Sequence, residues 1–443
     1  MITFSDQIHD RILIDLRGQA VSLMADSCKR WGKNYEGIVV YTNERLYLFS
    51  ILSAQELKAS TLSTLISDVV KECKDNNINV ISVNTDNAAN NKKALNGKSG
   101  SAQVKSNSHF IREPCSAHTC DLAIKDMFSK DDEFGFLNKC IETLIDHLPQ
   151  GTYTPGYGPS YKTIRWRSLL NCAKFINQNL NEYKKSNIKE VVKSLKKVEK
   201  KIGWKCLVQM LEIVCNFLDQ IERDLASIAD ILPPFLDACQ KLREMKVEPA
   251  DKLRKHLQYR FRDTCSLKLP IVAFLLTDKG LQYYRSMIYD RVPLLFVCLN
   301  EIEEYLKERD FAQKIIWNIK ICFQYYLQYF DIQEFSKFDK PIHMWKYLIT
   351  NNKIENMEPL IFFAIEILLI PSSEAAVERV FRALSELTES NMSKISRETI
   401  NARLVVKFDS IFGRAGPISW EDFGNETKDI FKLKKYPIFN LNK

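Results

Sequence analysis

The sequence predicts an α/β protein whose mixed sheet is interrupted by a large all-α insertion. The first 150 or so residues contain short β-rich runs around one amphipathic stretch. From about residue 170 to 345, apolar residues recur every three or four positions, and no strand pattern interrupts them. The link 149–160 is rich in Gly, Pro, Ser and Tyr, which is typical of a loop or a domain boundary.

Four apolar runs in the first part predict strands, with an amphipathic helix at 55–74 before the last. The runs are 21–27, 35–42, 45–52 and 79–86. Only Asn43 and Glu44 separate the second run from the third, which indicates an antiparallel hairpin. Because a helix precedes the fourth run, we expect it to return parallel to the first. Asp26 and Asp86 would then lie at the C-terminal ends of neighbouring strands, where ligands gather in open α/β sheets.

Composition sets the broad class. The chain has 443 residues, 45% hydrophobic and 27% charged, which is typical of a globular protein of two or three domains. Its net charge of +8 suits a polyanionic partner without requiring one. Twelve cysteines without a CxxC pair, and a start that lacks the apolar core of a signal peptide, predict reduced thiols inside the cell. The apolar stretch 360–371 is shorter than the ~20 residues of a membrane span and predicts a buried helix.

Four segments resemble, in order and spacing, the motifs of hAT-superfamily transposases. They are SVNTDNAANNKKAL (82–95), REPCSAHTCDLAIKDM (112–127), KTIRWRSLL (162–170) and PSSEAAVERVFRALSEL (371–387). Each motif is weak alone, but the resemblance spans about residues 5 to 412. It implies an RNase H-like catalytic core interrupted by a helical insertion, with the last catalytic helix supplied after the insertion and packed into a C-terminal dimerisation region. Such family members cut DNA with a DDE triad that holds two divalent metal ions.

Carried onto this sequence, the resemblance implies that Asp26, Asp86 and Glu378 are the triad and the metal ligands. Mg²⁺ or Mn²⁺ would be the cofactor, since hard cations that keep several waters prefer carboxylates. Two such ions ~3.5–4 Å apart activate an attacking oxygen and stabilise a departing one. Taken alone, Asp86 is more often a helix N-cap, Asp26 a turn residue and Glu378 a solvated helix position. Glu374 lies one turn before Glu378, and only alignment to the family's Glu-Arg pair favours Glu378.

The resemblance also implies DNA-contacting residues. Cys115 and His118 form the family's CxxH motif, which is half a zinc site without an obvious second half, so we expect a structural or DNA-positioning role. Trp166 resembles a family tryptophan that stacks on a flipped-out base, although a core tryptophan is an equal alternative. Arg165 and Arg167 flank it and could hold phosphates on either side.

Lysines recur at helical spacing across 184–205, opposite a row of valines and leucines, and predict a basic stripe on an amphipathic helix. The stripe includes Lys189, Lys193, Lys196, Lys197 and Lys200. Most such stripes are simply solvated faces. Here the stripe opens the predicted insertion, where family members contact DNA.

We expect residues 1–160 to form the first part of the core and 161–345 the helical insertion. Residues 346–412 would carry the last catalytic helix and the dimerisation region, followed by a tail at 413–443. Three positions depart from the family pattern: Cys28 stands where a tryptophan is usual, and Val377 and Arg382 replace serines. No BED-type zinc finger precedes the core.

Two functions follow as expectations. The first is metal-dependent DNA strand cleavage or transfer by a truncated or host-adopted transposase. The second is a catalytically inactive, dimeric DNA- or protein-binding factor that keeps the fold. Both imply a nuclear protein that binds DNA and forms a homodimer, or a larger homo-oligomer, through its C-terminal region.

Overall fold

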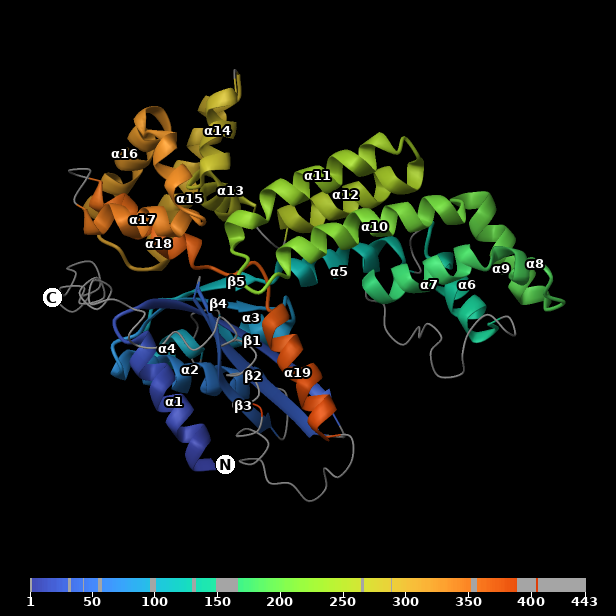
Figure 1. Ribbon diagram of the computed structural model, residues 1–443, viewed down its shortest axis with the longest axis horizontal. Helices are drawn as coiled ribbons and strands as arrows, with labels where there is room; N and C mark the ends of the chain where they lie inside the picture. Colours follow the sequence, from blue (N-terminus) through green and yellow to red (C-terminus); the bar gives the residue numbers. More distant parts are fainter. Residues whose placement is uncertain are drawn as a thin grey trace. The chain divides into compact units, whose positions relative to one another are not determined.

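The computed structural model describes most of the chain (Figure 1). The described residues are 2–30, 33–42, 44–54, 58–95, 101–129, 133–148, 166–263, 267–287, 289–351, 357–388 and 404. The chain divides into two compact units. Unit 1 comprises Met1–Cys115, Glu222–Asp230 and Leu267–Lys443, and unit 2 comprises Ser116–Ile221 and Ile231–Ser266.

Unit 1 contains a five-stranded mixed sheet of order β3-β2-β1-β4-β5. The strands are β1 (Ala20–Arg30), β2 (Lys33–Tyr41), β3 (Leu46–Ala54), β4 (Asn79–Thr85) and β5 (Ile111–Pro114). β2 pairs antiparallel with β1 and β3, and β4 pairs parallel with β1 and β5. The predicted α/β class, the hairpin and the parallel return of the fourth run are therefore confirmed. β5 was not predicted, because it has four residues and two of them are charged.

Helices cover both faces of this sheet (Figure 1). α1 (Ile2–Leu16) and α2 (Ala59–Asp75) lie on one face, and α19 (Ala375–Thr388) packs against β1 and β2 on the other. Two shorter helices, α3 (Ala89–Leu95) and α4 (Ala102–Ser106), follow β4. Each helix has one apolar side, whereas β4 is buried on both of its faces, and the apolar side chains of helices and strands meet in one core.

A second group of helices completes unit 1. It contains η1 (Ile228–Asp230), α13 (Lys268–Leu275), α14 (Asp278–Ser286), α15 (Arg291–Glu308), α16 (Gln313–Tyr329), η2 (Ile332–Lys337), α17 (Pro341–Thr350) and α18 (Glu358–Leu368). α18 is buried, as its apolar sequence predicts. None of the helices in the described part of the chain combines the length and apolarity that crossing a membrane requires.

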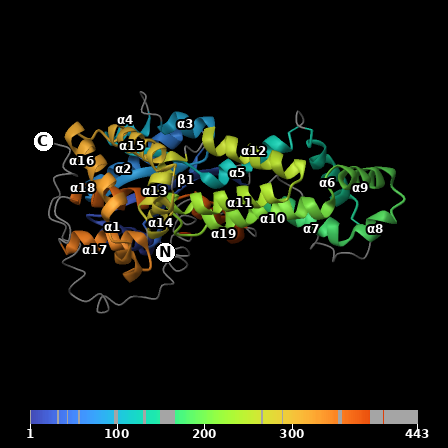
Figure 2. The same cartoon turned by 90° about the horizontal axis from the view of Figure 1, so that it is seen from above.

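Unit 2 is helical throughout its described residues. Its helices are α5 (Ser116–Met127), α6 (Phe136–Asp146), α7 (Trp166–Gln178), α8 (Leu180–Lys184), α9 (Lys189–Lys201), α10 (Trp204–Ile221), α11 (Leu232–Glu244) and α12 (Glu248–Asp263). α12 packs on α5 and α11, and α11 packs on α10, so these four helices run side by side (Figure 2). α9 packs on α6, and α7 packs on α10.

The compact units do not follow the expected domain boundaries at 160 and 345. Residues 116–148 belong to the helical unit, and the helices from 267 to 345 belong to the unit that contains the sheet. An amphipathic helix shows from its sequence that one side is buried, but not which partner buries it, and this explains the difference. The predicted link 149–160, the tail and almost all of the expected dimerisation region after α19 lie outside the described residues.

Candidate functional site

Asp26 and Asp86 lie at the same level of the sheet. The last paired residues of the parallel strands β1 and β4 are Met24 and Asn84, and each aspartate follows two residues later. Asp86 comes directly after β4, as predicted. Asp26 does not end its strand, because β1 continues to pair with β2 as far as Arg30. Both aspartates are nevertheless just beyond the end of the β1–β4 ladder.

Gly37 brings α19 close to Asp26. Asp26 pairs directly with Gly37 of β2, and directly opposed residues of an antiparallel pair project from the same face. A Cβ atom at Gly37 would lie 3.1 Å from Cγ1 of Val377 and 3.3 Å from Cζ of Phe381. Asp26 therefore shares its face with α19, whose first turn carries Glu378. A glycine inside an apolar strand is the sequence signal for such a close approach.

Glu374 is the most buried acid of the site, with 4% of its surface exposed. It immediately precedes α19, and its backbone carbonyl accepts hydrogen bonds from the N–H groups of Val377 and Glu378. Burial raises the pKa of the Glu374 carboxyl well above its usual range, and the charges of Asp26, Asp86 and Glu378 raise it further. The structure thus brings the three predicted acids and Glu374 within electrostatic reach of one another.

Two oxygen atoms beside this cluster are buried without a partner among the described residues. They are Oε2 of Glu374 and Oδ1 of Asn84. The Asn84 side chain donates its amide to the carbonyl of Pro371 at 3.1 Å, which fixes the start of α19 over β4. Leaving a buried acceptor unpaired costs about 1–3 kcal/mol, so both atoms would gain from a cation or a proton donor.

The chemistry of this donor set fits a hard divalent cation, because carboxylate and amide oxygens are the ligands that Mg²⁺ and Mn²⁺ prefer. A metal site also requires that the side chains lie close enough together to share one ion. Within the described ranges, no group of three or more His, Cys, Asp and Glu side chains is arranged so that it could hold a metal ion.

The Asp86 side chain also stabilises its own turn. Its Oδ1 atom accepts hydrogen bonds from the N–H of Ala88, at 2.8 Å, and from the Asn91 amide. Arg112 of β5 donates to the Asp86 carbonyl at 2.7 Å and to Oδ1 of Asn87 at 3.1 Å. Asp86 is not the helix N-cap considered as the alternative, because α3 begins at Ala89, but one of its carboxylate oxygens closes the turn before that helix. Arg112 was missed because β5 has only four residues, two of them charged, and so gives no apolar pattern against which this arginine would stand out.

Cys115 belongs to the acidic cluster. It is buried, its N–H donates to the Thr85 carbonyl at 2.8 Å, and a hydrogen bond from its thiol lowers the pKa of Glu374. A side chain that is buried in this way does not offer the surface contact with DNA that the resemblance implies. His118, three residues later, is half-buried on α5 of unit 2.

The predicted base-stacking segment is only partly described. Arg165 and the side chain of Trp166 lie outside the described residues, although Trp166 begins α7. Arg167 forms an ion pair with Asp219 of α10 at 2.6 Å, and both side chains are more than half exposed. Part of the charge predicted to hold phosphate is therefore offset by a neighbouring acid.

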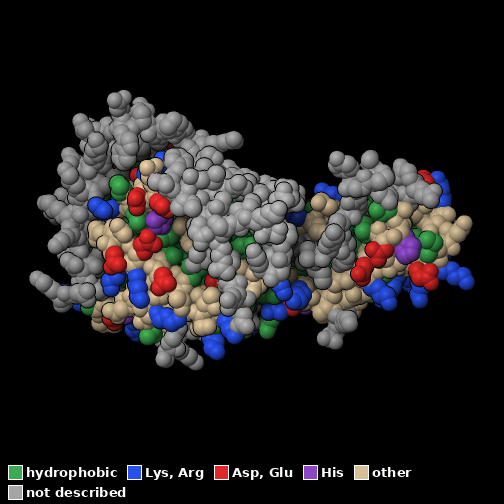
Figure 3. Space-filling view, turned by 90° about the horizontal axis from the view of Figure 1, so that it is seen from below, with side chains coloured by type: hydrophobic (Ala, Val, Ile, Leu, Met, Phe, Trp, Pro, Cys, Tyr) green, Lys and Arg blue, Asp and Glu red, His purple; other side chains and the backbone are tan. Residues whose placement is uncertain are grey.

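The lysine stripe of α9 is exposed and has no ion pair or hydrogen bond within the described part of the chain. Its members, four and three residues apart on one face, are Lys189, Lys193, Lys196 and Lys200. The opposite face of α9 is buried. Lys197 departs from the stripe, since its Nζ lies 4.4 Å from the centre of the Phe136 ring on α6. Basic side chains gather at the end of unit 2 that contains α6–α9, with acids and a histidine among them (Figure 3).

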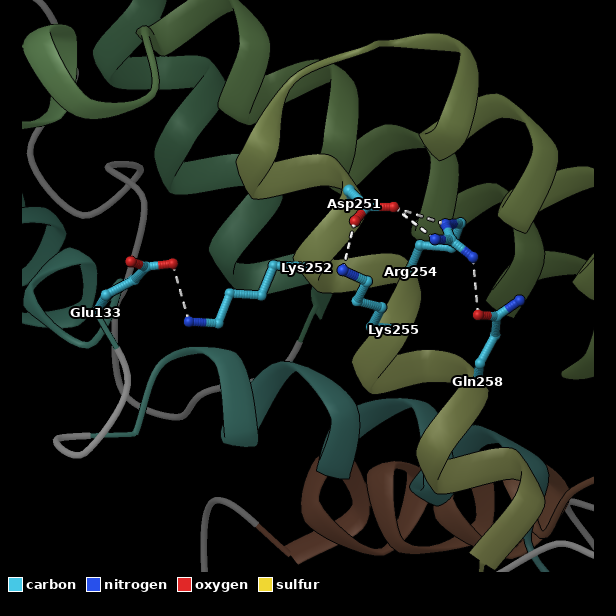
Figure 4. A network of polar contacts seen from close by, with 6 residues as sticks. All are labelled: Glu133, Asp251, Lys252, Arg254, Lys255 and Gln258. Carbon is cyan, nitrogen blue, oxygen red and sulfur yellow. Dashed lines mark hydrogen bonds and ion pairs between the residues drawn. The ribbon is translucent and has the colours of Figure 1, made fainter.

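Basic residues on α12 have local partners instead (Figure 4). Lys252 pairs with Glu133 and Lys255 pairs with Asp251, each at 2.9 Å. Arg254 also bonds Asp251, and it donates to Gln258 at 2.8 Å. These pairs offset much of the charge of α12, whereas the lysine stripe of α9 has no such partners among the described residues.

The positive charge of the chain is concentrated in unit 2. By sequence, this unit has 24 Lys and Arg against 17 Asp and Glu, a formal charge of +7 out of the chain's +8. Unit 1, which holds the acidic cluster, is nearly neutral by the same count.

No known protein family has a model that matches this chain, and no curated protein matches it.

Proposed function

We propose that this chain is a hAT transposase-like protein with an RNase H-like core, which binds DNA and cleaves or transfers strands at Asp26, Asp86 and Glu378. The observation that carries the proposal is the meeting of these acids at one site. They are up to 352 residues apart in sequence, yet all three act on the same buried carboxyl of Glu374. A helical unit is inserted in the sequence between the last strand, β5, and α19, which packs on the sheet, and this order supports the RNase H-like reading.

The resemblance, and not the arrangement of the side chains, assigns Mg²⁺ or Mn²⁺ to Asp26, Asp86 and Glu378, where such ions would activate the attacking oxygen and stabilise the departing one. The protein positions these acids by local hydrogen bonds. The Ser27 N–H donates to Oδ1 of Asp26 at 2.7 Å, and the turn after β4 fixes Asp86. Because its pKa is raised, Glu374 keeps a proton at a higher pH than an ordinary carboxyl and so does not add a fourth negative charge beside the three acids.

DNA is the proposed partner, and the nucleus the proposed location. The unpaired lysine stripe of α9 would contact phosphates, which supply most sequence-independent affinity for DNA. Self-association through the C-terminal region remains part of the proposal, on the resemblance alone.

A second candidate is the catalytically inactive, DNA- or protein-binding factor. The hydrogen bonds of Asp86 favour it, since an aspartate that stabilises a turn has a structural role even without catalysis. Val377, one of the departures from the family pattern, is a core residue packed near Gly37, and Arg382 is exposed.

Nicking of a supercoiled plasmid in Mg²⁺ or Mn²⁺ separates the two candidates. The proteins to compare are the parent, Asp86→Asn, Glu378→Gln and the control Glu358→Gln, which changes an exposed acid in the first turn of α18. If the acids hold the metal, the parent and Glu358→Gln nick the plasmid, and the other two variants do not.

Absence of nicking by the parent, together with salt-sensitive DNA binding shared by all four proteins, would establish the second candidate. Equal nicking by all four proteins would place the activity elsewhere or in a contaminant, and would refute the acidic site.

A further inference from the structure

α16 carries an exposed ridge that neither proposed function uses. Every fourth residue along it is a large, mainly aromatic side chain, here called the aromatic ridge: Trp317 (62% exposed), Ile321 (42%), Tyr325 (54%) and Tyr329 (67%). The opposite face of the helix is buried. Exposed apolar side chains normally occur singly on a protein surface, so four in a row indicate an interaction surface.

α15 extends this surface at one end. Glu303 of α15 pairs with Lys320 of α16 at 2.5 Å. The two helices form an antiparallel hairpin, so the start of α15 lies beside the end of α16. Val292 and Phe296 are exposed near the start of α15, one turn apart, and so lie at the same end as Tyr329.

The aromatic ridge is uncharged, which decides the class of its partner. Lys320 is the only charged residue from 315 to 330, and Glu303 offsets its charge. Nucleic acid binding depends largely on cations that meet phosphates, so this ridge does not suit it. Tryptophan and tyrosine with few charges are the residues that dominate protein–protein interfaces.

We propose that a second copy of this chain covers the aromatic ridge, with α16 packed antiparallel on α16 of its partner. Rows of side chains four residues apart form the ridges that fit into the grooves of a facing helix, and a twofold axis lets the same surface pair with itself. The charges at the two ends support this orientation. Lys314 is exposed near the start of α16 and Asp331 just after its end, so an antiparallel pair brings opposite charges together.

The available area is close to what a stable dimer needs. A large aromatic side chain has roughly 150–250 Å² of surface, and about half of it is exposed on these residues. The ridge with Val292 and Phe296 would bury on the order of 600 Å² per copy, against about 800 Å² per partner in a standard interface.

The mass of the full chain, measured by light scattering across a concentration series, tests this proposal. The test variant is Tyr325→Lys, and the matched control is Tyr259→Lys on α12, where the tyrosine is equally exposed at 54%. We expect Tyr325→Lys to halve the mass of the associated parent without lowering its melting temperature, and Tyr259→Lys to leave the mass unchanged. A parent that stays monomeric at about 100 µM, or a Tyr325→Lys protein with the parent's mass, would overturn the proposal.

A charge exchange distinguishes this interface from the expected C-terminal one. Lys314→Glu should weaken association, because it places two acids together, and adding Asp331→Lys should restore the parent's mass. Asp331 also accepts a hydrogen bond from the Gln333 N–H, and replacing Asp331 removes this bond. The melting temperatures of the double variant and of Lys314→Glu are therefore measured first, and their masses are compared when these temperatures agree. Association only through the C-terminal region would leave every variant at the parent's mass and would refute the ridge interface.

Discussion

Gly37 controls how closely α19 approaches the sheet, and through it the distance between Asp26 and Glu378. A Cβ atom there would be tighter against Val377 than ordinary contacts allow. The glycine is therefore as much a part of the site as the acids, although it contributes no functional group.

Gly37→Val should destabilise the protein by about 1–3 kcal/mol, the usual cost of overpacking a core. Urea unfolding measures this change. Val377→Ala removes the atom that the new side chain would meet, so the double variant should lose less stability than the two single variants added together. Strict additivity would show that α19 does not pack as described.

Glu113 of β5 makes stability depend on pH. Burial raises the pKa of its carboxyl from 4.5 to about 8, with Arg112 opposing and Glu301 and Glu308 adding to the rise. The folded protein then holds a proton that the unfolded chain releases, so stability falls as the pH rises from about 4.5 to 8. The total loss is on the order of 5 kcal/mol.

Glu113→Gln removes the buried carboxyl that titrates, and with it this pH dependence of stability. Its stability relative to the parent should increase between pH 4.5 and 8 and stay constant above, as measured by urea unfolding at a series of pH values. Glu358→Gln, at an exposed helix start, should follow the parent throughout. A parent and a Glu113→Gln variant whose stabilities run parallel over this range would rule out the buried, protonated carboxyl.

The sequence predicted the site residues to different extents. Asp86 directly follows the end of a strand, which local patterns reveal, whereas the strand end predicted at Asp26 was wrong because β1 continues to Arg30. Glu378 was chosen over Glu374 only by resemblance, and the structure shows that Glu374 is the more buried of the two. The contacts of Asn84 with Pro371 and of Glu374 with Cys115 join segments over 250 residues apart, so no local pattern could predict them.

At the scale of elements, local patterns predicted the longer segments. The runs 35–42 and 79–86 differ from β2 and β4 by at most two residues at either end. α1 was overlooked although its buried Ile8, Ile12 and Leu16 recur every fourth residue, which is a clear helical signal. β5 is too short for any such signal.

α9 gives a prediction about binding to DNA. Each lysine that contacts a phosphate adds about 0.9 to the slope of log K against log salt, so Lys193→Gln with Lys196→Gln should reduce that slope by about 1.8. Fluorescence anisotropy with a short duplex at several salt concentrations measures it. The control is Lys252→Gln with Lys255→Gln on α12, whose charges already have acidic partners. Equal slopes for the two double variants would show that α9 is a solvated face.

At the scale of the whole molecule, Arg309 explains why the helices after residue 267 belong with the sheet. The residue is buried just after α15, and its guanidinium donates to the carbonyls of Val80 and His109 and to the Glu366 carboxylate at 3.2 Å. These bonds join α15 and α18 to the strand that leads to Asp86. Nothing in the local sequence distinguishes Arg309 from a surface arginine, so the expected boundary at 345 was misplaced.

Arg309→Met should cost about 3–5 kcal/mol of stability, because it leaves the Glu366 carboxylate buried without its cation. Adding Glu366→Gln should recover part of this loss. Arg262→Met, at an exposed position on α12, is the matched control and should change stability by less than about 0.5 kcal/mol. A similar small effect of Arg309→Met would show that the pair does not join the helices to the sheet.

The order in which the acids appear along the chain has a consequence for synthesis. Asp86 leaves the ribosome 292 residues before Glu378. At ordinary translation rates this interval is roughly 15 to 60 s, during which unit 2 is made and has time to fold. A product that stops before α19 therefore carries the basic helix but never completes the acidic cluster. Under the proposed function, α19 thus decides whether a copy that has bound DNA can cut it.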